Sequence, residues 1–298
     1  MENLSGRTAV VTGAGGGIGR SIALSLARAG VNVAISDIDE PAAQAVAAEA
    51  TEIGVRSVGV RTDVSRLEDV ERLAETAFGT FGAVDILVNN AGVTMRPFRA
   101  SWDTDYRDFQ WVMNVNFWGV LNGFHAFVPR MRATPGEKHI VSTSSASSLV
   151  ITPGHSAYSA SKAAGDALSM CVRAEFELSG QPIGVSILFP GGVKTRISTS
   201  ERLRPETEQS ENRSTIPWSS YLPDPAQAAR GAEDQETIAS AQTRRTTDAI
   251  DPGEVGPMVV EGIRHNRPFI LTHPAPADAI RDRADQLLNA YQPIAARP

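Results

Sequence analysis

The sequence predicts an α/β protein built on a doubly wound parallel sheet of the Rossmann type. Short apolar segments alternate with amphipathic helical segments between residues 8 and 189, which is the pattern of parallel strands covered by helices on both faces. A glycine cluster at residues 13–19 follows the first apolar segment and opens the first helical one, as phosphate-binding turns do. Apolar residues make up 42% of the 298-residue chain and charged residues 21%, so a packed globular core is expected.

The first third of the chain is expected to form four strands and three helices. The strands are expected at residues 8–12, 31–36, 55–61 and 84–88. The helices are expected at residues 18–29, 41–53 and 67–81. Each strand is a short apolar run, and each helix repeats its apolar residues at helical spacing. Pro41 lies in the first turn of the second helix, where a proline is tolerated.

The alternation continues as far as residue 189. A helical segment in two pieces is expected at 106–131, a strand at 139–142, a helix at 157–178 and a strand at 183–189. Right-handed crossovers between such strands give a doubly wound sheet.

The periodicity lapses after Pro190. Residues 197–250 are polar with scattered prolines, and a stretch of this length inside a compact domain is typically functional or disordered. We interpret it as a substrate-lid insertion. Residues 251–298 are expected to form a C-terminal helix, strand and helix at about 252–265, 267–272 and 277–291. The prediction is therefore one catalytic, dinucleotide-binding domain spanning residues 1–298.

Composition excludes several classes of function. The net charge is −6, which argues against nucleic acid or an anionic membrane as a partner. No apolar run approaches the ~18 residues of a membrane-spanning helix, and the N-terminus has no signal-peptide pattern, so a cytoplasmic location is expected. The single cysteine, Cys171, excludes an intrachain disulfide framework, and its neighbours Met170 and Val172 predict that it is buried. The five histidines have no metal-ligand spacing, so no metal is predicted.

The glycine cluster predicts a dinucleotide site. Gly13, Gly17, Ile18 and Gly19 would bring backbone and a helix N-terminus close to a pyrophosphate. Asp37 closes the second strand and would accept hydrogen bonds from the adenosine ribose, while its charge would repel a 2′-phosphate. The cofactor prediction is therefore NAD rather than NADP. The alternatives are an ordinary glycine-rich turn and a solvated turn acid.

Tyr158 and Lys162 form the predicted catalytic pair. They lie four residues apart on one helix face, and Lys162 is one of only three lysines in the chain. A tyrosine with a pKa near ~10 is a poor base at neutral pH, and a fixed ammonium nearby would lower that pKa. Such a pair alone is more often a surface pair, and the glycine turn makes the catalytic interpretation the better one.

With these motifs the chain resembles the short-chain dehydrogenase/reductase family. The matching motifs occur in the family's order over residues 5–196. They are Thr12-Gly13-x-x-x-Gly17-Ile18-Gly19, Asp63-Val64, Asn89-Asn90-Ala91-Gly92, Asn116, Ser144-Ser145, Tyr158-x-x-x-Lys162 and Pro190-Gly191-x-Val193-x-Thr195.

The resemblance implies a role for each matched residue around the cofactor. Asp63 and Val64 would border the adenine, and Asn90 and Ala91 would line the ribose region. Gly92 would start the adjoining turn. The last two matched positions, which would bind the carboxamide, are Val193 and Thr195.

The resemblance also implies the catalytic roles. Asn116 would kink its helix and, with Lys162, hold a proton-relay water. Ser145, with Ser144 as the alternative, would hydrogen-bond the substrate oxygen. Tyr158 would be the acid/base, and Lys162 would bind the nicotinamide ribose. His155 is expected to be a loop histidine that faces solvent or substrate.

The predicted substrate is a bulky secondary alcohol or ketone, such as an aryl or alicyclic compound. The residues expected to form an apolar pocket for it are Met95, Phe98, Trp102, Leu149, Val150, Ile197, Ile216, Trp218, Tyr221 and Leu222. The runs at 122–131 and 200–205 are similar to bacterial dehydrogenases of lignin-type aryl-ether alcohols. By the same resemblance, the helices at 109–130 and 157–178 imply a homodimer or homotetramer.

Two other functions stay open at this stage. One is a non-catalytic dinucleotide-binding regulator on the same fold, and the other is an epimerase or dehydratase. The first would be favoured by loss of any catalytic residue, and none is lost. The second has a differently spaced glycine turn.

Overall fold

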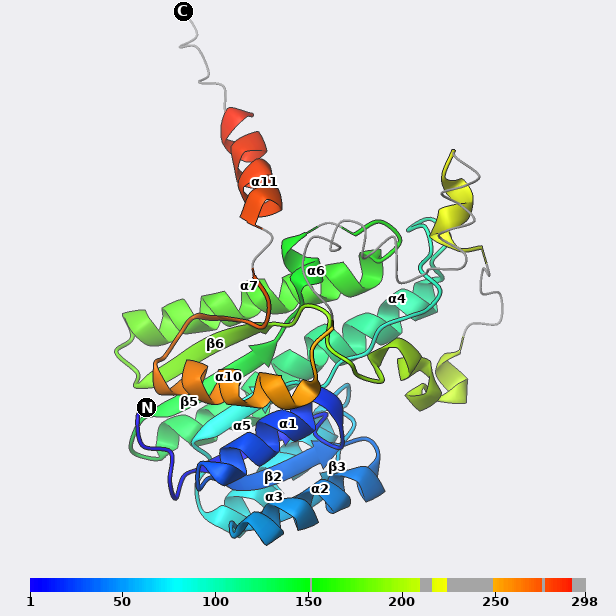
Figure 1. Cartoon of the computed structure of the whole chain (residues 1–298). Coiled ribbons are helices and arrows are strands. Elements are labelled where there is room, and N and C mark those ends of the chain that lie inside the picture. The colour runs from blue at the N-terminus through cyan, green and yellow to red at the C-terminus, as the bar shows by residue number, and fades with distance from the viewer. Residues whose placement is uncertain (151, 210–215, 224–248, 275–276, 291–298) are drawn as a thin grey trace, which may run out of the picture.

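The core of the protein is one seven-stranded parallel sheet (Figure 1). The structure, a computed structural model, describes residues 1–150, 152–209, 216–223, 249–274 and 277–290. The strands lie in the order β3-β2-β1-β4-β5-β6-β7. They are β1 (Thr8–Thr12), β2 (Asn32–Asp37), β3 (Ser57–Arg61), β4 (Ile86–Asn89), β5 (Lys138–Thr143), β6 (Ile183–Phe189) and β7 (Phe269–Leu271).

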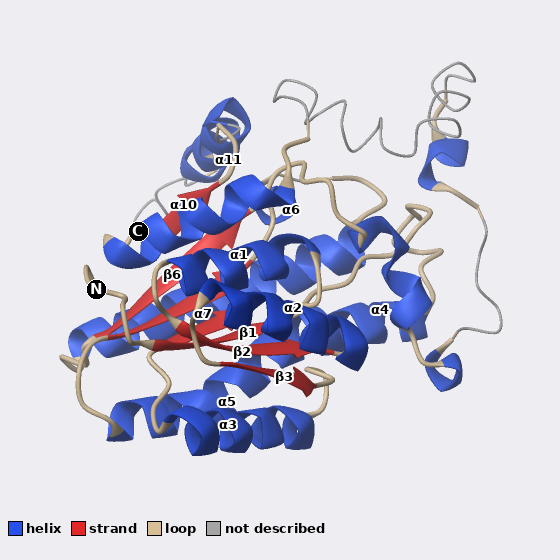
Figure 2. Ribbon diagram, turned by 60° about the horizontal axis from the view of Figure 1, so that its bottom comes forward, coloured by secondary structure: helices blue, strands red, loops and turns tan. Residues whose placement is uncertain are grey.

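Helices cover both faces of this sheet (Figure 2). One layer holds α1 (Gly17–Arg28), α2 (Glu40–Ile53) and α10 (Pro252–Arg264). The other holds α3 (Leu67–Phe81), α5 (Gly119–Ala133) and α7 (Ser156–Leu178). The predicted fold class, a doubly wound parallel sheet, is confirmed. The strand order reverses between β1 and β4, and in such sheets ligands bind beyond the carboxyl ends of the strands at this point.

The elements fall where the sequence predicts, with small differences at the ends. β1, β6 and α3 have the predicted bounds. The expected two-piece helix at 106–131 is α4 (Tyr106–Met113) and α5, joined by a π-helical turn at Asn114–Trp118. β7 is shorter than the predicted 267–272. The short helix α6 (Ala146–Leu149) and the projecting helix α11 (Ala277–Asn289) complete the described helices longer than a 3-10 turn.

The two ends of the predicted lid insertion lie side by side. Val193 and Ile250 pair as a single parallel bridge. The Lys194 N–H donates to the Ile250 carbonyl at 3.0 Å, and the Ile250 N–H donates to the Gly192 carbonyl at 3.0 Å. Within the insertion, the structure describes 3-10 turns at Ile197–Leu203, Glu206–Glu208 and Trp218–Tyr221. The parts of the predicted lid at 210–215 and 224–248 lie outside the described residues.

One core prediction is wrong. Cys171 lies on the outward side of α7 and is exposed. Its apolar neighbours Met170 and Val172 predicted burial. Val172 does pack against the core, but Met170 is itself exposed, so only part of this apolar run faces the sheet. Among the helices of the described residues, none has the length and apolar content needed to cross a membrane.

Candidate active site

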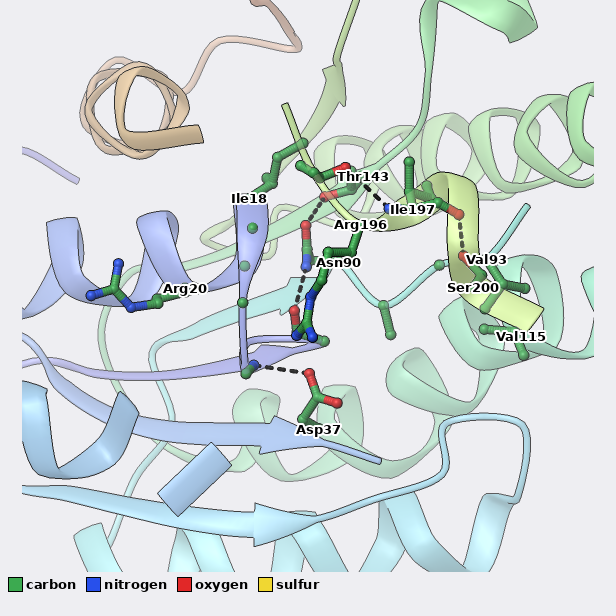
Figure 3. A pocket seen from close by; sticks show the side chains of 18 of the residues that line it. Ile18, Arg20, Asp37, Asn90, Val93, Val115, Thr143, Arg196, Ile197 and Ser200 are labelled. Carbon is green, nitrogen blue, oxygen red and sulfur yellow. Dashed lines mark hydrogen bonds between the residues drawn. The ribbon is translucent and has the colours of Figure 1, made fainter. Parts of the chain in front are cut away.

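The carboxyl ends of the strands border a cavity of about 810 Å³. Its walls include the turns after β1, β2, β3, β4, β5 and β6 and the start of the lid insertion. Figure 3 shows side chains from these segments facing one another across it. All sixteen residues predicted for the site are near this edge, and Asn116 is the only one that does not line the cavity itself.

The glycine turn allows two backbone segments to touch. Gly13 has a φ of +62°, and a Cβ there would lie 2.7 Å from the Ala91 Cα. A Cβ on Gly19 would lie 2.2 Å from the Gly13 carbonyl oxygen. Any larger residue would push α1 away from the turn after β4, so these positions require glycine. The result is an open cradle at the N-terminus of α1, which has no side-chain cap.

A threonine that sequence reasoning left without a role braces this cradle. The Thr12 Oγ1 accepts hydrogen bonds from the Asn90 N–H at 3.0 Å and the Ala91 N–H at 3.1 Å. The Asn90 amide in turn donates to the Thr12 carbonyl at 2.9 Å and accepts from the Thr143 hydroxyl at 3.2 Å. Asn90 lines the cavity as predicted, and its amide is also a tie between β1, β4 and β5.

Asp37 lies at the far end of the glycine turn. Its Oδ2 accepts from the Gly15 N–H at 2.9 Å and its Oδ1 from the Asp39 N–H at 3.1 Å. Each carboxylate oxygen keeps a lone pair for a further donor, such as a ribose hydroxyl. Arg20, the basic residue next to the glycine turn, pairs with Glu49 instead, so it does not neutralise Asp37.

The remaining predicted cofactor residues also reach the cavity wall. Asp63 lines it and turns its carboxylate onto the Ser65 N–H and hydroxyl. Val64 is nearly buried against Gly119. Two predicted positions follow β6 and line the opposite wall of the cavity. They are Val193 and Thr195.

Lys162, Asn116 and Gly92 converge behind this cavity. A Cβ on Gly92 would lie 3.1 Å from the Lys162 Nζ and 3.3 Å from the Asn116 Oδ1. Lys162 donates to the Thr143 carbonyl at 2.8 Å. Asn116 lies in the π-helical turn, and its amide is fixed by the Val93 N–H at 2.8 Å and the Val93 carbonyl at 3.0 Å. The hydrogen-bond pattern of the helix therefore changes from α to π around Asn116, the position at which a kink was predicted.

Burial shifts the pKa of both members of the catalytic pair. It lowers the pKa of the Lys162 ammonium from 10.5 to about 8, a change that Asp166 opposes. It raises the pKa of the Tyr158 phenol, which packs among Val93, Trp111 and neighbouring apolar side chains, and the hydrogen bond with Ser145 opposes the rise. In the protein without cofactor the pKa of Tyr158 is therefore raised, and not lowered as expected. Desolvation of the phenolate has a larger effect on this pKa than the neighbouring polar groups have.

The two candidate serines have different partners. Ser145 hydrogen-bonds Tyr158 and faces the cavity. Ser144 hydrogen-bonds Ser148 at 3.1 Å and also Asp166, a half-buried carboxyl whose pKa burial raises. Asp166 lies one turn after Lys162 on α7 and was missed by sequence reasoning. Its engagement of Ser144 leaves Ser145 as the serine that reaches the tyrosine.

Of the two alternatives predicted for His155, a ring that faces solvent is wrong. The ring does not point to solvent: it stacks on Tyr158 with centroids 4.5 Å apart and planes at 11°, and it contacts Phe98 at 4.4 Å. Its Nε2 shares a hydrogen bond of 2.8 Å with the Thr94 hydroxyl. Burial, and then the charge of Arg96, lowers its pKa to about 3. His155 is thus a neutral platform for the tyrosine ring.

The predicted apolar pocket is only partly assembled. Of its members, Ile197 lines the main cavity, and Met95 lines a small adjoining cavity with Tyr158. Trp102, Trp218 and Tyr221 pack edge-on or tilted against one another at 5.6–6.2 Å, and Trp102 is 70% exposed. The hydrophobicity of these side chains indicated that they cluster. It did not indicate that they pack against one another instead of lining the cavity.

A buried ion-pair cluster fixes the start of the lid insertion. The Asp108 carboxylate on α4 is fully buried and binds Arg99 at 3.3 Å and Arg204. The Arg204 guanidinium also lies 5.0 Å from the centre of the Trp111 ring, and Trp111 lines the cavity. Among the residues that the structure describes, no group of three or more acidic, histidine or cysteine side chains could hold a metal ion.

Comparison with known proteins agrees with this geometry. The family described as short chain dehydrogenase matches residues 7–206. A 1-deoxy-11-beta-hydroxypentalenate dehydrogenase of Streptomyces exfoliatus is 39% identical over 193 residues, which is 65% of this chain and 70% of that protein. A C alpha-dehydrogenase of Sphingobium sp. is 28% identical over 299 residues, which is all of this chain and 90% of that one. The structure of a short chain dehydrogenase/reductase from Burkholderia phymatum in complex with NAD is 32% identical, covers 100% of both chains and has a TM-score of 0.84.

Proposed function

The chain belongs to the short-chain dehydrogenase/reductase family, and on that basis we propose that it is an NAD-dependent alcohol dehydrogenase or ketoreductase acting on a secondary alcohol or ketone. The observation that carries the proposal is the convergence of Ser145, Tyr158 and Lys162 on the cavity that the glycine turn opens. A dinucleotide-binding protein without catalysis would not need a buried tyrosine bonded to a serine beside a buried lysine.

The residues present fit NAD. The glycine cradle leaves room at the α1 N-terminus for a pyrophosphate, which backbone amides and the helix dipole stabilise. Asp37 has free lone pairs for ribose hydroxyls and would repel a 2′-phosphate. NAD in the relative from Burkholderia phymatum supports the same choice. The cofactor-binding set that we propose is Gly13, Gly17, Ile18, Gly19, Asp37, Asp63, Val64, Asn90, Ala91, Gly92, Tyr158, Lys162, Val193 and Thr195.

The catalytic residues that we propose act by positioning and proton transfer. Ser145 orients the substrate oxygen toward Tyr158, which takes the alcohol proton as phenolate or donates it as phenol. Bound NAD supplies the hydride acceptor, and its positive ring favours the phenolate. Lys162 adds a second positive charge. Asn116 donates to the hydroxyl of Ser161, the residue before Lys162 on α7, at 3.0 Å. Proton transfer by a placed side chain contributes ~10²–10⁴-fold to rate.

We propose a bulky aryl or alicyclic substrate and a lid formed by residues 197–250, within one catalytic domain. The apolar side chains at the substrate end of the cavity, Val93, Trp111, Ile197 and Leu203, support an apolar substrate. The similarity to the C alpha-dehydrogenase over the whole chain supports the aryl-alcohol subgroup. A cytoplasmic homodimer or homotetramer is part of the same proposal.

The oligomer proposal draws on apolar side chains that one subunit leaves uncovered. Trp118 is 47% exposed, Met170 37% and Leu178 90%. All three lie on the helical segments that sequence reasoning assigned to subunit contact.

The test is an NADH absorbance assay with a panel of aryl and alicyclic secondary alcohols, run beside NADP. We expect reduction of NAD, and loss of turnover in Tyr158→Phe while NADH binding, followed by fluorescence, is retained. Full activity of Tyr158→Phe would contradict the acid/base assignment. Binding of NADH without turnover of any alcohol or ketone would favour a regulator.

A further inference from the structure

An arginine immediately before the lid insertion lies beside the glycine cradle. Arg196 follows Thr195 and precedes the turn at Ile197–Leu203. Its Nη2 lies 3.6 Å from the position that a Cβ on Gly16 would take, and Gly16 is the N-cap of α1. Figure 3 shows this side chain reaching from the lid segment into the cleft, close to Asn90 and the glycine turn.

Arg196 differs from Arg20 and Arg202 on this wall in that its guanidinium donors bind no other group among the described residues. Arg20 is bound by Glu49, and Arg202 donates to the carbonyls of Arg196 and Thr199 at 3.1 and 2.8 Å. Within the described part of the chain, the Arg196 guanidinium has neither an ion pair nor a hydrogen-bond acceptor. The first turn of α1 contains no acidic side chain that could bind it.

The position matches the chemistry of a diphosphate. Backbone amides at the N-terminus of α1 would bind one side of a pyrophosphate, and a guanidinium lying over Gly16 faces the other side. Arginine suits this task because its planar fork donates two parallel hydrogen bonds to phosphate oxygens. Glycine at position 16 leaves the space between the guanidinium and the helix open.

We propose that Arg196 binds the pyrophosphate of the cofactor and so ties the lid to it. This inference rests on the proposed use of NAD. Arg196 immediately precedes the lid insertion, and Arg204, eight residues later, is fixed to Asp108. With both contacts made, the segment from 196 to 204 spans the cavity between the cofactor and the buried anchor. The diphosphate thus orders the wall against which the substrate binds.

The experiment measures dissociation constants of NADH, NADPH and ADP-ribose by calorimetry for wild type, Arg196→Gln, Arg196→Lys and Arg20→Gln. A charge-assisted hydrogen bond contributes enough for a loss of about tenfold. We expect Arg196→Gln to weaken NADH and ADP-ribose by the same factor of about ten, and Arg196→Lys to recover part of it. Arg20→Gln, the matched control on the same wall, should change either affinity by less than about twofold.

Three results would overturn the inference. Equal affinity of wild type and Arg196→Gln for ADP-ribose would show that the guanidinium does not touch the diphosphate. A loss confined to NADPH would assign Arg196 to a 2′-phosphate. An equal loss of affinity in Arg20→Gln would show that binding depends on the overall positive charge of this wall and not on Arg196 in particular. Absence of NADH and ADP-ribose binding in the wild type would instead contradict the proposed function, so the two failures are distinguishable.

Discussion

Replacing Lys162 with methionine should remove an unfavourable contribution to the folding free energy whose size depends on pH. The ammonium is 4% exposed, and burial lowers its pKa from 10.5 to about 8. Between these two values the unfolded chain binds the proton more strongly than the folded protein, so stability rises with pH across that window. At pH 7 the difference corresponds to about 3 kcal/mol of destabilisation, and by pH 10 to about 1 kcal/mol.

The variant has no such group, so the difference between the two proteins should change with pH. Loss of the hydrogen bond to the Thr143 carbonyl costs the variant about 1–3 kcal/mol at every pH. The absolute difference at pH 7 is therefore small. As pH rises from 7 to 10, the wild type should gain about 2 kcal/mol relative to Lys162→Met.

Urea unfolding of the cofactor-free proteins at several pH values measures this gain. Lys138→Met is the matched control, because Lys138 is equally buried but binds the Asp85 carboxylate at 2.8 Å. Removing it breaks a buried pair, so that variant should be less stable than wild type at pH 7. A Lys162→Met difference that stays constant between pH 7 and pH 10 would refute the reasoning.

Three further predictions concern the cofactor, the lid anchor and the histidine platform. Asp37→Ser should raise kcat/KM with NADP relative to NAD by tenfold or more, roughly the effect of removing one like charge, and steady-state kinetics with both cofactors checks it. Asp108→Asn should cost about 3–5 kcal/mol in urea unfolding because two buried arginines lose their counter-charge, and KM should rise as the lid start loosens. His155→Phe should keep the stack on Tyr158 and show the same pH–rate profile as wild type, since His155, with its pKa lowered to about 3, is neutral throughout pH 6–9. A wild-type limb near pH 6.5 that disappears in His155→Phe would contradict that assignment.

The sheet could be predicted from sequence because its strands have a recognisable local sequence pattern. A parallel strand buried on both faces is an almost unbroken apolar run, and β1 and β6 are of that kind. The predicted site residues meet at one edge for the same reason. All but Asn116 follow a strand or lie in the first turns of the next helix, and the carboxyl ends of parallel strands lie together.

What the sequence could not supply is the direction in which some individual side chains point. His155 precedes α7 in a loop, and nothing in its neighbours indicates that its ring stacks on Tyr158. Cys171 lies in an apolar run, but the run sits on a long helix whose outer face is not covered by the sheet.

The pKa values are also a property of the assembled structure. An ammonium four residues from a phenol suggests a lowered phenol pKa, yet both groups lose their water when the helix packs. Desolvation depends on everything that surrounds Tyr158, including Val93 and Trp111 from distant segments. Spacing along one helix carries no information about those segments.

The bridge between Val193 and Ile250 makes the insertion between them an exchangeable cassette. Its two ends pair next to β6, so the cost of closing the loop between them depends only on the length of that loop. The entropy of a closed loop grows only logarithmically with length, by about 0.6 kcal/mol per doubling. Segments of quite different length and composition could therefore be fitted between the same two residues with the sheet and the cofactor turn unchanged. Under the proposed role of residues 197–250 in substrate selection, a new substrate range could be acquired by replacing a single continuous piece of chain.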